Sequence, residues 1–150
     1  EAGRGARLYL WDLSGGKPRA FTPEGYRTFA RTVSPDGKLV AARGPDQRLY
    51  LYPIAGGEPA PLPGLTADDT PVGWFADGRS LYVIRRRELP AKVYRMDVAT
   101  GLKELWRELM PSDSAGVTNI SPPLLASDGK SYAYSYVRTL SDLYLVEGLK

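Results

Sequence analysis

Three aspartates are candidates for chemistry because their carboxylates recur in the same local sequence. Each is followed by glycine, and the Asp-Gly pair appears three times along the chain. Repeated carboxylates can act as general acids or bases, or hold a metal ion. A catalytic site, however, needs one constellation and not three equivalent copies. We therefore interpret the three pairs as structural turns: Asp36-Gly37, Asp77-Gly78 and Asp128-Gly129.

The 150 residues contain neither histidine nor cysteine. This composition excludes disulfides, zinc sites built on thiolate or imidazole, a cysteine nucleophile and the Ser-His-Asp triad. Carboxylates, lysine, tyrosine and serine remain, and only a minority of enzymes work with those groups alone. We expect no catalytic residue, no metal and no cofactor in this segment.

A second set of candidates consists of arginines and aspartates in predicted loops, among them the cluster Arg85-Arg86-Arg87 and the adjacent acids Asp68-Asp69. A charged loop tip is often only a solvated surface, and Asp68-Asp69 lack the dense oxygen pattern of a calcium loop. Loops on a rigid scaffold are nevertheless where binding usually resides. The sequence predicts a protein- or peptide-binding rim made of Arg43, Asp68, Asp69, Arg85, Arg86, Arg87 and Arg138.

Charge and hydropathy limit the other partners. A net charge of +3 is too small to imply a nucleic acid, so we expect none to bind this segment. The longest apolar stretches, such as Val72–Ala76, have four or five residues, whereas a membrane span needs about 20. We expect no membrane insertion by this segment.

Two interleaved motifs predict the elements that position these residues. The Asp-Gly pairs are 41 and then 51 residues apart, and each precedes a strand-like run. Between them recurs a tyrosine-centred motif at Leu8-Tyr9-Leu10, Leu49-Tyr50-Leu51, Val93-Tyr94-Arg95 and Leu143-Tyr144-Leu145. Asp-Gly favours tight reversal between strands, so each period contains four short antiparallel strands.

A four-stranded unit of about 40 to 50 residues is the size of one β-propeller blade, whereas sandwiches do not repeat one sequence at this period. We predict an all-β fold, a partial β-propeller of four-stranded antiparallel blades over residues 1–150. Two blades are complete (28–62 and 70–107), and two are incomplete: the third and fourth strands of a first blade (7–22) and the first three strands of a last one (117–146). Since closed propellers have about four to eight blades, either further blades upstream or a homodimer would close the ring.

The repeat resembles that of a known family. Ser34-Pro35-Asp36-Gly37-Lys38, followed by an apolar strand, Leu-Tyr-Leu and Gly-Gly, resembles the WD-repeat-like propeller repeat of TolB-type proteins over nearly the whole chain. The Ser-Pro pair is present only in the first copy. The closing stretch 134–150 is similar to the C-terminal ending of bacterial eukaryote-like serine/threonine kinases that carry such propellers, and to winged-helix regulators with the same sensor half.

This resemblance implies a noncatalytic interaction, sensor or scaffold module at the C-terminal end of a larger bacterial signalling protein, with any kinase or DNA-binding domain upstream. The segment itself contains no kinase motif. Two alternatives are a gating propeller of a prolyl-oligopeptidase-type serine peptidase, whose hydrolase domain would follow, and a small self-associating propeller protein. We expect the compartment, periplasmic or cytoplasmic, to depend on the part of the protein that lies upstream.

Overall fold

The computed structural model describes residues 5–126, 130–144 and 147–148. These residues form fourteen β-strands and no helix, so the prediction of an all-β chain is confirmed. Accordingly, the described chain offers no helix with the length and apolar character to cross a membrane.

The middle of the chain forms two four-stranded antiparallel sheets in which each strand pairs with the next one along the sequence. The first consists of β3 (Arg27–Val33), β4 (Leu39–Arg43), β5 (Leu49–Pro53) and β6 (Ala60–Pro61). The second consists of β7 (Asp69–Trp74), β8 (Ser80–Arg85), β9 (Ala91–Asp97) and β10 (Lys103–Leu109).

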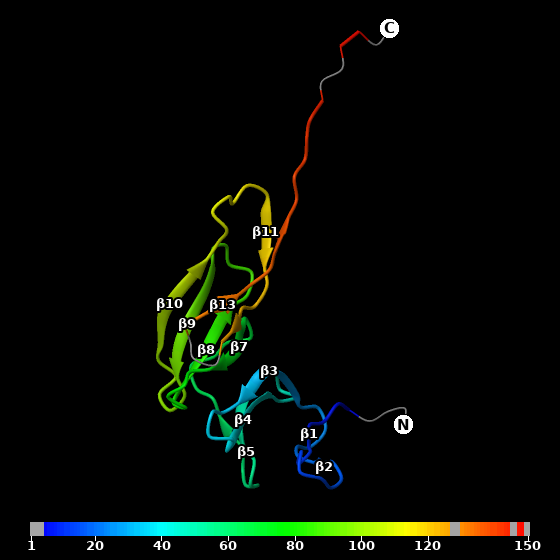
Figure 1. The fold of residues 1–150 in the computed structure, drawn as a ribbon, viewed down its shortest axis with the longest axis vertical. Helices are drawn as coiled ribbons and strands as arrows, with labels where there is room; N and C mark the ends of the chain where they lie inside the picture. The colour runs from blue at the N-terminus through cyan, green and yellow to red at the C-terminus, as the bar shows by residue number, and fades with distance from the viewer. Residues whose placement is uncertain (1–4, 127–129, 145–146, 149–150) are drawn as a thin grey trace.

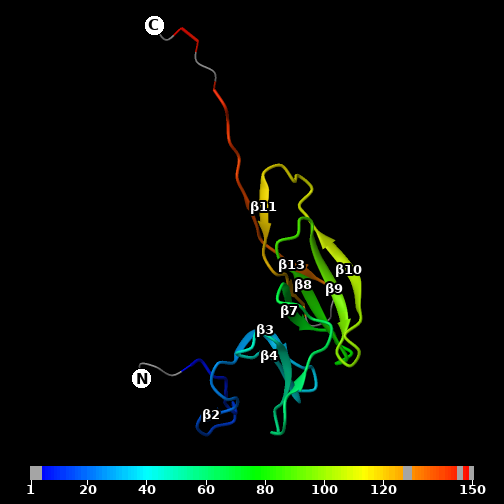
Figure 2. The same cartoon turned by 180° about the vertical axis from the view of Figure 1, so that it is seen from behind.

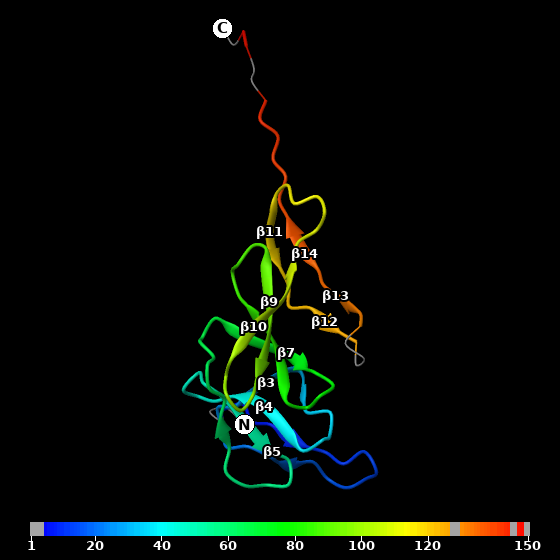
Figure 3. The same cartoon turned by 90° about the vertical axis from the view of Figure 1, so that its left-hand side faces the viewer.

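Each end of the chain forms a smaller sheet. At the N-terminal end, β1 (Tyr9–Leu10) pairs with β2 (Arg19–Ala20). At the C-terminal end, β11 (Val117–Ile120) pairs with β14 (Tyr136–Arg138), and β12 (Leu124–Leu125) pairs with β13 (Tyr132–Ala133), so that two segments run side by side as one interrupted hairpin (Figure 3). The interruption lies at Pro122-Pro123, because proline has no N–H to donate to the ladder.

The third strand predicted for this last sheet, around Leu143 and Tyr144, is not formed by those two residues. They are 99% and 81% exposed, on an arm that leads away from the sheets (Figure 1). In the complete sheets the reversal between second and third strands contains a residue with positive φ, Gln47 (65°) or Arg87 (63°). The segment 139–142 holds neither glycine nor proline, and the chain continues in the direction of β14.

The Asp-Gly pairs close the turns between first and second strands. Gly37 and Gly78 have φ of 70° and 66°, a conformation that glycine adopts at little cost. The Asp36 carboxylate accepts hydrogen bonds from Ser34 Oγ (2.6 Å) and from the backbone N–H of Lys38 (3.1 Å). The third pair, Asp128-Gly129, lies outside the described residues.

The core lies between sheets, because both faces of the central sheet are apolar. On β8, Leu81 and Val83 join Ala41 and Met96 in the cluster facing the first four-stranded sheet. The alternate residues Tyr82 and Ile84 join a cluster with Ile120 and Leu125 of the last sheet. The sheets thus stack face to face in chain order (Figures 1 and 2). Within the described residues this stack is open and forms no closed ring.

Replacing Leu81 by alanine tests this packing. Leu81 is 0% exposed, so Leu81→Ala removes buried methyl groups and leaves a cavity, and we expect it to lower the free energy of unfolding by about 3 kcal/mol. The control is Leu105→Ala, at a leucine that is 53% exposed, for which we expect less than about 1 kcal/mol. Urea unfolding followed by circular dichroism measures both, and equal losses would contradict the inter-sheet core.

Candidate functional site

One edge of the stack collects the loops in which binding residues were predicted. In an antiparallel meander alternate turns lie at opposite ends, so the second-to-third-strand loops 44–48 and 86–90 share an end with the connectors 62–68 and 110–116 between sheets. The backbone N–H of Arg86 donates to the carbonyl of Asp68 (3.0 Å). We call these four segments the loop edge.

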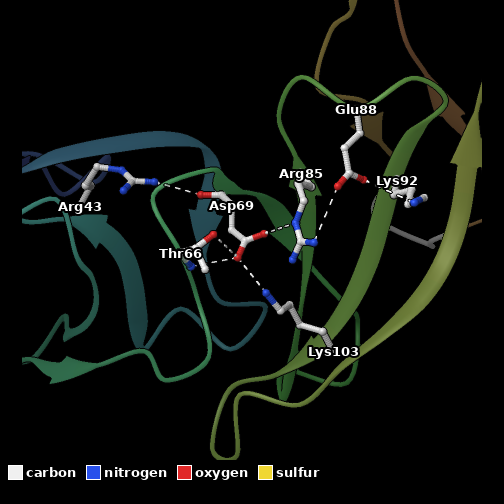
Figure 4. Close-up of polar contacts among 7 residues, drawn as sticks. All are labelled: Arg43, Thr66, Asp69, Arg85, Glu88, Lys92 and Lys103. Atoms are coloured by element: carbon white, nitrogen blue, oxygen red, sulfur yellow. Dashed lines mark hydrogen bonds and ion pairs between the residues drawn. The ribbon is translucent and has the colours of Figure 1, made fainter.

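A buried carboxylate anchors the loop edge. Asp69, the first residue of β7, is 0% exposed. Its Oδ2 accepts hydrogen bonds from Lys103 Nζ (2.7 Å), from the backbone N–H of Thr66 (2.9 Å) and from Thr66 Oγ1 (3.0 Å), while Arg85 Nε lies 3.4 Å from Oδ1 (Figure 4). Arg43 of the neighbouring sheet donates to the Asp69 carbonyl (3.0 Å). The network therefore ties the two four-stranded sheets together.

These partners decide the charge of Asp69. Burial alone would raise the pKa of its carboxyl, but the hydrogen bonds from Lys103 and Thr66 outweigh burial and hold the pKa below its ordinary value. Asp69 is therefore ionised at neutral pH. With donors already on both of its oxygens, it serves as a structural anchor.

Arg85 connects this anchor to the surface. Its Nη1 lies 3.7 Å from Glu88 Oε1, and Lys92 Nζ lies 3.8 Å from Glu88 Oε2. The Arg85 guanidinium also lies over the ring of Tyr94, 5.4 Å from its centroid. Charges of alternating sign thus run outward from Asp69 to Lys92 along the loop edge.

A cleft of about 510 Å³ opens beside this chain of charges, between the β8–β9 loop and β11. Its lining combines the guanidinium-bearing residues Arg85, Arg86 and Arg87 with apolar Leu89 and Ile120 and with polar Thr118, Asn119 and Ser121. Two buried oxygens in it, Thr70 Oγ1 and Glu88 Oε2, have no hydrogen-bond partner among the described residues. The cleft therefore offers positive charge, buried acceptors and apolar contact within one space.

The structure divides the predicted rim residues into four groups. Arg43, Asp69 and Arg85 belong to the buried network, while Arg86 and Arg87 are exposed and line the cleft. Arg138 lies apart from them and binds the Asp113 carboxylate through Nη1 (2.8 Å). Asp68 is exposed and contacts Arg86 through its backbone.

Several residues that complete the site were missed by sequence reasoning. Lys103 is 34 residues from Asp69, and no motif links the two. Thr66 precedes Asp69 by three residues, a spacing that is common in loops and gave no distinct signal. Glu88 lies in the predicted loop, but its partially buried setting depends on β11, which is distant in sequence.

The site carries no arrangement that points to a metal, because no group of three or more potential ligand side chains gathers among the described residues. A scan against protein-family models and a search of curated proteins each found no match to this chain. The interpretation of the loop edge therefore rests on its own geometry and on the repeat.

Removing the buried carboxylate tests the anchor. Asp69→Ala leaves Lys103 and Arg85 without their common partner, and we expect it to lower the free energy of unfolding by about 3 kcal/mol. Asp68→Ala is the matched control, since the neighbouring carboxylate is exposed and forms no ion pair with the described residues. Its expected effect is below about 0.5 kcal/mol in the same urea titration. Comparable effects of the two substitutions would show that Asp69 anchors nothing.

Acid stability provides a second test. The folded pKa of Asp69 lies below the unfolded value near 3.8, so its ionised form stabilises the fold above that pH, and this stability is lost as the pH falls through the folded pKa. We expect the wild type to lose more stability between about pH 6 and pH 3 than Asp69→Asn, which cannot titrate there. Thermal melts across this range measure the difference, and parallel curves for the two proteins would contradict it.

Proposed function

We propose that this chain is a noncatalytic protein- or peptide-binding module, that its stacked sheets are blades of a partial β-propeller, and that the cleft beside Arg86 and Arg87 receives the partner. The blade assignment is supported by three features together: four antiparallel strands per sheet, sheets stacked in chain order, and the repeated Asp-Gly and tyrosine motifs.

The composition of the cleft is the observation that carries the proposal. Arg86 and Arg87 offer guanidinium groups for a carboxylate, and Glu88 Oε2 offers a buried acceptor for an N–H donor. Leu89 and Ile120 add apolar surface. A peptide with an acidic side chain presents all three complementary features: a carboxylate for the arginines, backbone N–H donors for Glu88 Oε2, which accepts no hydrogen bond from the described residues, and apolar surface.

The position of the cleft supports the same function. It lies between a loop and a strand of different sheets, both held by the apolar core, so its walls are preorganised and little ordering accompanies binding. The resemblance to TolB-type repeats, and of the closing stretch to kinase-linked propellers, supports a sensor or scaffold role within a larger bacterial signalling protein such as a serine/threonine kinase.

Peptide selection tests this proposal. A phage-displayed library of random dodecapeptides is selected on the immobilised chain, and the synthetic winners are measured by fluorescence polarisation. We expect the selected peptides to be enriched in Asp and Glu. We also expect Arg86→Glu/Arg87→Glu to weaken their binding by at least about tenfold, because like charges would face each other across the contact.

The matched control is Lys38→Glu/Arg79→Glu, which changes the net charge equally at exposed positions beside the Asp-Gly turns, on the opposite end of the sheets. We expect this variant to bind the peptides within about twofold of the wild type. An equal loss in both double variants would indicate nonspecific charge attraction and would contradict a site at the cleft.

A further inference from the structure

The cleft beside Arg86 and Arg87 runs along the edge of a strand. Its lining includes five consecutive residues, Thr118 to Pro122, of which the first three belong to β11. Side chains of a strand point alternately to its two faces, so a cleft against one face would be lined by every second residue. Neighbouring residues line a common space where that space follows an edge. Because β14 occupies one edge of β11, the cleft lies along the other (Figure 3).

The register of β11 identifies the main-chain groups that face this edge. Ser121 donates its N–H to the carbonyl of Ser135 (2.8 Å), so the backbone of Ser121 points toward the β14 side. Ile120 lies opposite Tyr136, which is the adjacent, non-hydrogen-bonded position of an antiparallel ladder. The N–H and the C=O of Ile120 therefore point away from β14 and toward the cleft, and they pair with no backbone group among the described residues.

Several polar groups along the cleft are both sheltered and unpaired. Ile120 is 7% exposed, since it packs in one apolar cluster with Tyr82 and Ile84 of the central sheet. Thr70 Oγ1 and Glu88 Oε2 are buried in the same cleft without a hydrogen bond from the described residues. Polar groups removed from water are costly when unpaired, so a ligand that supplies their hydrogen bonds is favoured. The cleft therefore suits a ligand that carries N–H and C=O groups at short, regular intervals.

The open edge of β11 belongs to its position as the first strand of a sheet. The first strands of the two complete sheets, β3 and β7, also pair with one strand only. On β7 this edge already makes a contact. The Asp68 carbonyl accepts from Arg86 on the β8 side, so the next carbonyl, that of Asp69, points to the open edge, where it accepts from Arg43. First strands of this chain thus present main-chain groups to what lies beside them, and beside β11 lies the cleft.

We propose that the cleft binds its acidic peptide as an added β-strand, paired with β11 through the N–H and C=O of Ile120, with an acidic side chain on Arg86 or Arg87. An extended chain carries N–H and C=O groups along both edges, so one edge pairs with Ile120 and the other faces the loop that holds Glu88. A helix uses these groups internally and would leave those of Ile120 unpaired. Main-chain pairing supplies affinity, and the arginines supply the preference for acidic side chains. This inference rests on the proposed function, since it specifies how that partner is bound.

Isotope-filtered NMR tests the pairing directly. The labelled chain is saturated with an unlabelled peptide from the selection described above, and nuclear Overhauser contacts between the two are recorded. We expect contacts from the amide proton of Ile120 to backbone protons of the peptide, because paired strands lie close together along their ladder. The matched control is the amide of Ser121, whose N–H points to Ser135 on the other edge and should show none. A saturated complex without the Ile120 contacts would overturn strand pairing.

The conformation of the peptide gives an independent measurement. Positions that the selection leaves variable are replaced by α-aminoisobutyric acid, which favours a helix, or by valine, which favours a strand, so the charge of the peptide is unchanged. We expect the helix-favouring peptide to bind at least about tenfold more weakly and the valine peptide within about threefold of the original. The opposite preference, with binding still dependent on Arg86 and Arg87, would overturn strand pairing and leave the proposed function standing. If no acidic peptide bound the chain, both would fail.

Discussion

Each central sheet has two apolar faces, and this constraint underlies the rest of the structure. Along β8 successive side chains alternate between the cluster with Met96 and the cluster with Ile120, so neither face can be exposed to water without loss of hydrophobic stabilisation. A sheet of this kind is stable only between two neighbours. The face-to-face stacking of the central sheets follows from that requirement.

Asp69 is the one charged residue that is buried among the described residues, and the arrangement of its partners explains why the loop edge is held in position. Asp69 is buried at the end of the inter-sheet contact, where an unpaired carboxylate would be costly. Lys103, Thr66 and Arg85 supply its donors from three different segments, and Arg43 reaches its carbonyl from the neighbouring sheet. Disturbing the network therefore affects the relation between two sheets as well as one loop.

The parts of the fold that could be predicted from the sequence are those with local causes. An Asp-Gly pair makes its turn through its own φ and its own side-chain hydrogen bonds, so antiparallel strands on either side of such a pair could be expected from the sequence. The strand predicted around Tyr144 shows where local sequence is insufficient. Its motif has strand propensity, but pairing with β14 also requires a chain reversal that residues 139–142 do not make. The contact of Lys103 with Asp69 depends on sheet twist and on the adjacent sheet, which no local pattern encodes.

The cluster Arg85-Arg86-Arg87 shows why adjacent residues of one type need not share a role. Arg85 is the last residue of β8, and strand alternation directs its side chain to the face that holds Asp69. Arg87 has a φ of 63°, which turns the chain out of the strand and leaves its side chain exposed at the cleft. Because Arg85 also lies 3.7 Å from Glu88, one guanidinium contacts both the buried anchor and the wall of the cleft. Arg85 therefore joins Glu88 to Asp69 within one sheet, while Arg43 makes the contact from the neighbouring sheet to the Asp69 carbonyl.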